Sequence, residues 1–408
     1  MYFRLFHVKK NSLFWGFLMI CFAANAQVFL SEHAKISLLT TTPTDNEVYT
    51  LYGHTSIRVR DSVAANQKID YIFNYGMFDS SAPFFIYRFA IGKTDYFLDG
   101  YDFKYFLADH QLRNSNVYEQ EINLTHQEMQ DLWMALINNV QPENREYRYN
   151  FFFDNCATRP AQLIEQTVNG RIIYQENEVN RTFRDIINHC TRDHPWLTFG
   201  CDLALGSPTD RVVTLQESFF IPEYVRKAFS TAQIVHPDGT SRPLVSAEYL
   251  LVDHINDEDS RISLQNEVFT PFVCSLMLFA VVLWITLIEW RRKIYVRWVD
   301  CILFFVAGMA GCILFFLCFL SEHPSIWPNI SVLWLHPFHL AAVVLFSLKK
   351  LNRVAYFYHF ANFVALLLML FGWIFVTQQL NIAFIPLIAT LLLRSGYCLI
   401  RNRLVRIR

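Results

Sequence analysis

Internal repeats are absent from this sequence, which rules out a solenoid or a propeller. Apart from the acidic segment near Asp253 to Asp259, it also lacks low-complexity stretches. Basic residues are scarce over residues 27–270, which hold 20 Lys and Arg against 33 Asp and Glu, a net charge of −13. A region this acidic repels a phosphate backbone, so the composition argues against nucleic acid as a partner.

The first 26 residues have the layout of a cleavable secretory signal. Arg4, Lys9 and Lys10 precede an apolar run over 13–24, which is too short to span a bilayer. An Ala-Asn-Ala motif, which resembles a signal-peptide cleavage site, then ends at position 26. We therefore predict a signal peptide over residues 1–26 and a mature chain that begins at Gln27, outside the cytoplasm.

Apolar residues make up 53% of the chain, and after position 270 they form long runs. Five segments come close to the ~20 residues that a spanning helix needs. They cover 271–290, 301–320, 330–348, 355–377 and 382–400. We predict a domain outside the membrane over residues 27–265, and an all-α transmembrane domain of five helices over residues 266–408 that makes the protein integral to the membrane.

Basic residues indicate the orientation of these segments. Clusters of Lys and Arg follow the first, third and fifth segments, whereas the loops 321–329 and 378–381 contain neither. The positive-inside rule then predicts that residues 27–270 lie outside and that the C-terminus lies in the cytoplasm. Arg394, late in the fifth segment, is expected to extend its side chain to the inner interface.

Cysteine is rare in the predicted domain outside the membrane. Residues 27–270 contain three, which are Cys156, Cys190 and Cys201. In an oxidising compartment the simplest account of an odd count is one disulfide and one free thiol. Cys190 and Cys201 are close enough in sequence to close a short loop, which would leave Cys156 reduced. The spacing of His189, Cys190, His194 and Cys201 matches no familiar zinc pattern, so we predict no metal and no cofactor.

Cys156 stands between a predicted strand and a predicted helix. Aromatic residues alternate in EYRYNFFF (146–153), and after Asp154 and Asn155 apolar residues recur at helical spacing up to Gly170. A helix N-terminus lowers the pKa of a thiol, and its free N–H groups can hold an oxyanion. Cys156 is therefore a candidate nucleophile, and the alternative is a buried structural cysteine.

A thiol nucleophile needs a base, and His54 in LYGHTSIRV is the first candidate. It opens a short predicted strand beside Gly53, where another backbone or a substrate could approach closely. A third group should orient the imidazole, and in the next predicted strand Asn74 is the first choice and Asp70 the second. The competing histidines are His110, His126, His189 and His194.

Several motifs together resemble the bacterial lipoprotein N-acyltransferase family called Lnb. They are LYGHTSIRV, IFNYGMF, NVYEQEINL, PENREYRYNFFFDNCATR and HPWLTFGCDLALGSPTDR, followed by five apolar segments. The order of His and Cys is also similar to that of circularly permuted papain-like folds, including the lecithin:retinol acyltransferase group. The resemblance implies an α+β periplasmic domain, with an antiparallel sheet and helices, on a five-helix domain in the inner membrane. Pro160 and Cys201 depart from the family pattern.

The resemblance implies that Cys156 is the nucleophile and His54 the base, and we assign Asn74 as the orienting group. Asp154 and Asn155 are oxyanion or orienting candidates. The candidates for substrate binding are Tyr52, Tyr75 and Arg159.

The implied reaction moves an acyl chain from a membrane glycerophospholipid onto Cys156 as a thioester. The chain then passes to the α-amino group of a diacylglyceryl-cysteine lipoprotein. One alternative is a thiol hydrolase that acts on phospholipid esters or cell-wall amides with the same residues. Another is a scaffold of the cell envelope in which Cys156 and His54 are core residues.

The aromatic segment FDSSAPFFIYRFAIG (78–92) is open to two interpretations. It is either a buried strand or a loop that enters the membrane interface and guides an acyl chain.

Overall fold

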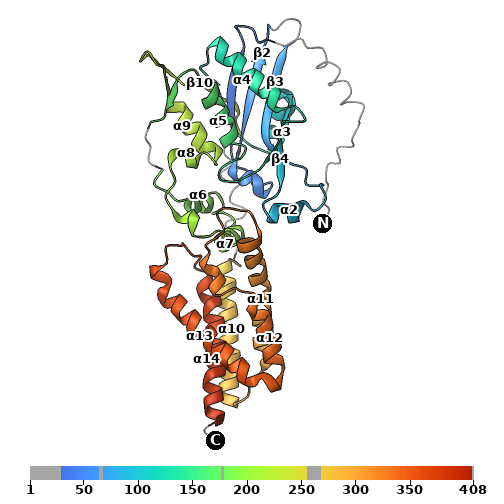
Figure 1. Ribbon diagram of the computed structural model, residues 1–408, viewed down its shortest axis with the longest axis vertical. Coiled ribbons are helices and arrows are strands. Elements are labelled where there is room, and N and C mark those ends of the chain that lie inside the picture. The colour runs from blue at the N-terminus through green and yellow to red at the C-terminus, as the bar shows by residue number, and fades with distance from the viewer. Residues whose placement is uncertain (1–28, 64–67, 176–178, 255–267, 407–408) are drawn as a thin grey trace.

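An α+β domain stands on a bundle of apolar helices (Figure 1). The computed structural model describes residues 29–63, 68–175, 179–254 and 268–406. The predicted signal peptide and the predicted first residue of the mature chain lie outside these residues. Within them, an antiparallel sheet with helices is followed by five helices long and apolar enough to cross a membrane, which confirms the predicted fold class.

The α+β domain is built on an antiparallel sheet that has seven strands in the described part of the chain. Their order is β10-β5-β1-β2-β3-β4-β6, so β2 is the middle strand. The strands are β1 (Lys35–Thr41), β2 (His54–Asp61), β3 (Ile69–Met77), β4 (Asp95–Asp102), β5 (Val117–Ile122), β6 (Glu146–Arg148) and β10 (Val245–Val252). A smaller sheet contains β7 (Arg171–Ile173), β8 (Gln233–Val235) and β9 (Ser241–Pro243).

The helices of this domain are short. In chain order they are η1 (Val48–Tyr52), α2 (Phe85–Ala90), α3 (Phe103–Leu112), α4 (His126–Asn139), α5 (Thr158–Thr167), α6 (Phe183–Cys190), α7 (Pro195–Ala204), η2 (Ser207–Asp210), α8 (Leu215–Ser218) and α9 (Pro222–Thr231).

Both faces of the large sheet are buried, because apolar residues occur on both sides of its central strands. Ile57 on β2 lies opposite Phe73 on β3, and both belong to the main core with Trp133 of α4. On the other face, Ile72 packs with Phe106 of α3. A one-residue slip would exchange the two faces, so this burial fixes the register of β2 against β3.

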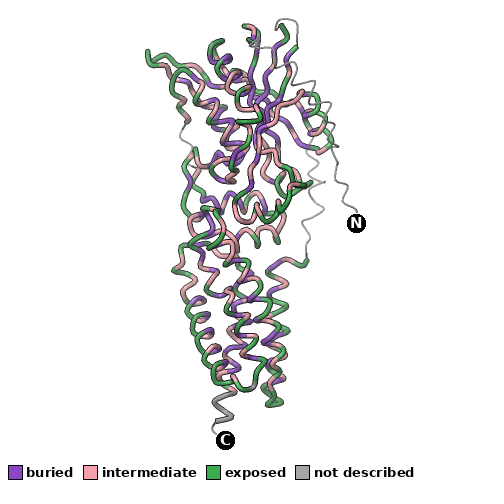
Figure 2. Tube along the Cα trace, turned by 45° about the vertical axis from the view of Figure 1, so that its right-hand side comes forward, coloured by how far each residue is buried: buried purple, intermediate pink, exposed green. Residues whose placement is uncertain are grey.

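The membrane-spanning segments lie where the sequence predicted them. They are formed by α10 (Pro271–Arg292), α11 (Arg297–Leu320), η4 (Ile330–Leu333) with α12 (Phe338–Ser347), η5 (Lys349–Leu351) with α13 (Asn352–Gly372) and η6 (Trp373–Phe375), and α14 (Phe384–Arg406). Many outward residues of this bundle are both apolar and exposed (Figure 2). Such a surface suits lipid rather than water.

The prediction for Arg394 was wrong. Its side chain is fully buried in the bundle, where Nε donates to Asp300 at 2.6 Å and Nη1 donates to Glu289 at 2.8 Å. Two carboxylates, one on α10 and one on α11, thus neutralise the charge inside the bundle. The side chain therefore stays buried and does not extend to the inner membrane interface.

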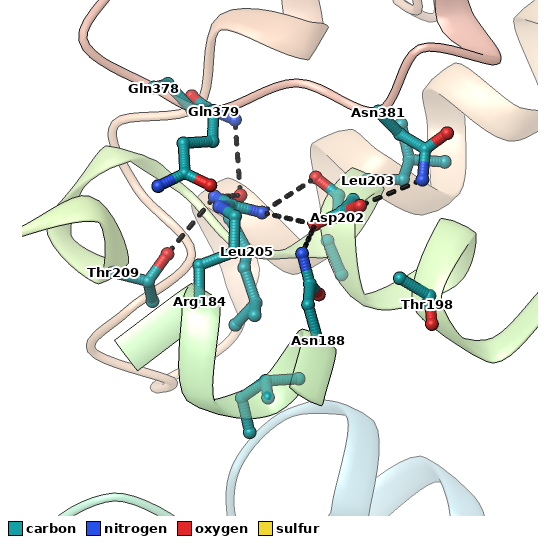
Figure 3. A network of polar contacts seen from close by, with 12 residues as sticks. Arg184, Asn188, Thr198, Asp202, Leu203, Leu205, Thr209, Gln378, Gln379 and Asn381 are labelled. Atoms are coloured by element: carbon teal, nitrogen blue, oxygen red, sulfur yellow. Dashed lines mark hydrogen bonds and ion pairs between the residues drawn. The ribbon is translucent and has the colours of Figure 1, made fainter. Parts of the chain in front are cut away.

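A buried guanidinium stands where the two domains meet (Figure 3). Arg184 of α6 has no exposed surface, and it forms ion pairs with Asp202 of α7 at 3.3 Å and with Asp210 of η2 at 2.8 Å. Its Nη2 also donates to the carbonyls of Leu205 and Gly206. These bonds hold α6, α7 and η2 in one arrangement.

The same residues bond to the membrane domain. Asp202 accepts a hydrogen bond from Asn381 at 2.9 Å, and the Leu205 carbonyl accepts one from Gln378 at 3.2 Å (Figure 3). The backbones are close here, because a Cβ added at Gly206 would lie 2.3 Å from the carbonyl oxygen of Ile326. Arg184 therefore supports the surface by which the α+β domain meets the bundle.

We expect Arg184→Gln to destabilise the protein strongly, because removing one partner of a buried pair typically costs ~3–5 kcal/mol. The measurement is the unfolding temperature of the full chain in detergent. Arg192→Gln is the matched control, since that arginine is exposed and pairs with Asp193 at the surface. An equal change in both variants would contradict a structural role for the buried charge.

Candidate active site

The turn before Cys156 differs from the strand that the sequence predicted. β6 ends at Arg148, and Asn150 and Asp154 exchange backbone hydrogen bonds across residues 151–153. The Asn150 side chain also accepts from the amides of Phe152 and Phe153. The predicted strand was thus too long, because an Asn side chain stabilised a turn in place of strand pairing.

Asn155 caps the start of α5. Its Oδ1 accepts from the amides of Ala157 at 2.8 Å and Thr158 at 3.0 Å, and its Nδ2 donates to the carbonyls of Phe151 and Phe220. The amide group therefore uses both its acceptor and its donor within the turn. Asn155 orients the loop that carries Cys156, and its own side chain is not free to hold an oxyanion.

Asp154 and Arg159 satisfy each other. The guanidinium donates through Nε at 2.5 Å and through Nη2 at 2.8 Å, and it lies over the ring of Tyr147. The two charges are close to the loop of Cys156, but each is already neutralised by the other.

The Cys156 sulfur lies against the end of β2. The backbone N–H groups of Thr55 and of Cys156 itself lie close enough to the sulfur to lower its pKa. Gly76 of β3 permits this approach, because a Cβ there would lie 3.0 Å from that of Cys156 and its φ of +88° favours glycine. Since Thr55 follows His54 directly, the sulfur lies beside the backbone next to the candidate base.

The thiol is not the preformed thiolate that its helix position suggested. Burial raises the pKa of Cys156 to about 11, and the two backbone amides offset only part of this effect. The expectation of a lowered pKa was therefore wrong, because desolvation outweighs the donors around the sulfur. At neutral pH the group is a protonated thiol that needs a base.

His54 is held by the predicted third residue. Its Nε2 lies 3.0 Å from Oδ1 of Asn74, which also accepts from Ser56, while Nδ2 of Asn74 donates to the Tyr101 hydroxyl. Because Oδ1 can only accept, Nε2 carries the proton and Nδ1 keeps a lone pair. Burial lowers the pKa of His54, and the charge of Arg113 lowers it further, whereas the bond to Asn74 raises it. The net pKa is below its ordinary value, so the ring is neutral at pH 7.

Gly53 has a structural role beside this histidine. Its φ is +76°, and a Cβ there would lie 2.6 Å from the carbonyl oxygen of Thr41. The close approach foreseen at this position is thus made by the backbone of β1.

The alternatives considered for base and orienting residue occupy other places. Asp70 pairs with Arg58 at 2.8 Å, His126 lies near Gln130, and His194 pairs with Asp45. His110 is near His54, and burial lowers its pKa to about 3. Among the described residues its Nδ1 has no hydrogen-bond partner.

Tyr52 and Tyr75 point to different surroundings. The Tyr52 ring packs on Phe151 with centroids 4.9 Å apart. Tyr75 is buried and accepts a hydrogen bond from Asn139 of α4, which places it in the main core. Tyr75 therefore packs as a core residue in this structure.

Cys190 and Cys201 are free thiols, so the disulfide considered between them is absent from this structure. The two residues belong to α6 and α7, and both pack against the apolar cluster around Phe183 and Phe220. They fill space there as small apolar groups. Among the described residues, no group of three or more His, Cys, Asp and Glu could hold a metal ion.

Alternation along the strand places Ser56 on the same face of β2 as His54, but the sequence did not indicate its bond to Asn74. Sequence reasoning also missed Tyr101 and the Thr55 amide. Tyr101 reaches Asn74 from β4, and nothing in its local sequence signals this contact.

Comparison with known families agrees with the two-domain architecture. Residues 26–189 match the family described as the Lnb N-terminal periplasmic domain, and residues 263–403 match the one described as the Lnb transmembrane domain. No curated protein and no solved structure matches the chain.

The raised pKa of Cys156 predicts the pH dependence of its alkylation. Because the neutral thiol prevails below about pH 11, labelling by iodoacetamide should rise about tenfold per pH unit from about pH 7 to about pH 10. Mass spectrometry of the peptide that contains Cys156 measures this rate. In the denatured chain the rise should level off near the ordinary value of about 8.5. Labelling of the folded chain that is independent of pH over this range would instead indicate a preformed thiolate.

Proposed function

Because the chain belongs to the Lnb family, with its periplasmic domain followed by its transmembrane domain, we propose that it is an N-acyltransferase of lipoprotein maturation. The acyl donor is a membrane glycerophospholipid, and the acceptor is the α-amino group of a diacylglyceryl-cysteine lipoprotein. The observation that carries the proposal is a sulfur that lies close to the amide next to His54, whose ring is oriented by Asn74.

The first half-reaction forms a thioester. His54 Nδ1 takes the thiol proton as the sulfur attacks the ester carbonyl carbon of the phospholipid. The amides of Thr55 and Cys156, which lie close to the sulfur, are the donors available to the oxyanion. When the carbon–oxygen bond breaks, His54 gives its proton to the departing alkoxide oxygen, which becomes the hydroxyl of the lysophospholipid.

The second half-reaction transfers the chain to nitrogen. The neutral α-amine attacks the thioester carbonyl carbon, and His54 accepts a proton from the nitrogen. The carbon–sulfur bond then breaks, and the proton returns to the sulfur. Because the resting thiol has a pKa of about 11, it regains the proton fully and the next cycle starts from the same neutral pair.

The proposal includes the cellular setting and the domain limits. The protein lies in the inner membrane with its C-terminus in the cytoplasm, since Arg291, Arg292 and Arg401 lie at the same ends of α10 and α14. The acyltransferase domain extends over residues 27–265, and the membrane domain over 266–408. The spans hold the thiol near the bilayer, where both lipid substrates are concentrated.

We expect Cys156→Ala and His54→Ala cells, in a strain without another N-acyltransferase, to accumulate lipoproteins that have a free α-amine and only the diacylglyceryl group. Cys156→Ser should be similarly defective, because a hydroxyl is far less acidic than a thiol. Mass spectrometry of N-terminal lipopeptides is the measurement. Cys190→Ala and His126→Ala are matched controls that should leave the third chain in place.

The same experiment separates transfer from hydrolysis. A hydrolase would release free fatty acid or wall fragments through Cys156 and leave lipoproteins unchanged. Triacylated lipoproteins in cells that contain normal amounts of the Cys156→Ala protein would refute the transferase.

Asn74→Ala tests the orienting role. Loss of its bond should misalign the ring and lower kcat/KM by about 100-fold, at the lower end of the 10²–10⁴-fold that acid–base catalysis typically contributes. Because that bond raises the pKa of His54, its removal should also move the acid limb of the pH profile to lower pH. Asn139→Ala, which removes the amide bonded to Tyr75, is the control and should leave the acid limb unchanged. A lower rate with no shift of the acid limb would point to a general structural defect.

A further inference from the structure

The segment before β4 forms a small helix, α2, most of whose apolar side chains stay exposed in the described part of the chain. None of the residues of α2 is buried, and Ile86 keeps 81% of its surface exposed. Phe84, which precedes the helix, is equally exposed and adopts a left-handed conformation that is unfavourable for a bulky residue. The interpretation of this segment as a buried strand was therefore wrong.

Contacts with the end of α11 place this helix at the level of the bilayer surface. The ring of Tyr87 lies 6.2 Å from that of Phe316, and His323 Nε2 lies 2.9 Å from the carbonyl oxygen of Phe89. Because Phe316 is four residues before the end of α11, Tyr87 reaches about one helical turn into the span. Exposed apolar residues of α11 continue the same surface, including Phe319 and Leu320. α2 thus lies beside exposed apolar residues at this end of α11.

A row of aromatic rings leads from this helix toward the thiol. Phe85 of α2 stacks on Phe78 at 5.5 Å, Phe78 contacts Tyr96 at 5.2 Å, and Tyr96 stacks on Tyr149 at 4.0 Å. Tyr96 and Tyr149 both lie close enough to Cys156 for its charge to affect their hydroxyls. These four rings, which we call the aromatic row, span the distance between the membrane surface and the sulfur.

We propose that α2 lies in the outer leaflet and that the aromatic row guides the acyl chain of the donor phospholipid to Cys156. Phe85, Phe78 and Tyr149 are partly exposed and Tyr96 is buried, and aromatic surfaces of this kind suit an aliphatic chain. Charged pairs flank it, including Arg88 with Asp95 and Lys93 with Glu322, at the level that a polar headgroup would occupy. This inference rests on the proposed function for its substrate, but the membrane position of α2 can be tested without any reaction.

The first test uses the full chain with Cys156→Ala in vesicles of phosphatidylethanolamine and phosphatidylglycerol. A trace of phospholipid with a diazirine in one acyl chain is activated by light, and labelled peptides are identified by mass spectrometry. We expect labels on 84–89 as well as on the outer turns of α11. Labels on α11 with none on 84–89 would overturn the proposal. Labels on 84–89 would uphold the membrane position even if no acyl transfer were ever detected.

The second test changes one exposed side chain. Ile86→Glu should lower kcat/KM for a diacyl phospholipid in vesicles by about tenfold, because an apolar contact with lipid is replaced by a charge. Acylation of Cys156 by a water-soluble short-chain thioester should stay unchanged, since that donor does not come from the bilayer. Val63→Glu, at an exposed apolar position just beyond the opposite end of β2, is the matched control. Full activity of Ile86→Glu in vesicles, or an equal loss in Val63→Glu, would overturn the proposed route.

Discussion

A guanidinium without access to water needs all its hydrogen-bond partners inside the protein. The position of the periplasmic domain on the bundle depends on the bonds that Arg184 makes. Its partners are two carboxylates, three carbonyls and a hydroxyl on α7, on η2 and on the turn between them. Two of those groups, Asp202 and the Leu205 carbonyl, also bond to the membrane domain. A single buried charge thus orders both the fold of α6 to η2 and the surface that rests on the bundle.

The periplasmic domain that Arg184 supports contains both Cys156 and His54. The thiol of Cys156 and the imidazole of His54 are both neutral at pH 7, and the buried surroundings that keep them neutral also make each hydrogen bond to a developing charge stronger than it would be in water. In the proposed reaction, charge appears only as the substrate reacts, beside the amides of Thr55 and Cys156. In its proton movements, the proposed mechanism resembles that of a serine–histidine system more than that of a thiolate–imidazolium ion pair.

Local patterns in the sequence were enough to indicate some of these features. The alternation of β2 and β3 placed His54 and Asn74 on facing strands, and hydropathy located the spans, because both signals depend on neighbours close in sequence. The end of β6 was misjudged because the side chain of Asn150 competed with strand pairing. Burial of Cys156 and the partners of Arg394 depend on residues brought together by folding. The bond between Asp202 and Asn381 joins residues 179 positions apart, which no local pattern encodes.

The buried cluster of Arg394, Glu289 and Asp300 has a consequence for how the protein is made. A helix that contains an unpaired arginine is costly to leave alone in lipid. α14 is synthesised after the two helices that supply its counter-charges. The ion pairs are therefore complete only when α14 meets α10 and α11, so closure of the bundle reports that all five spans have been synthesised.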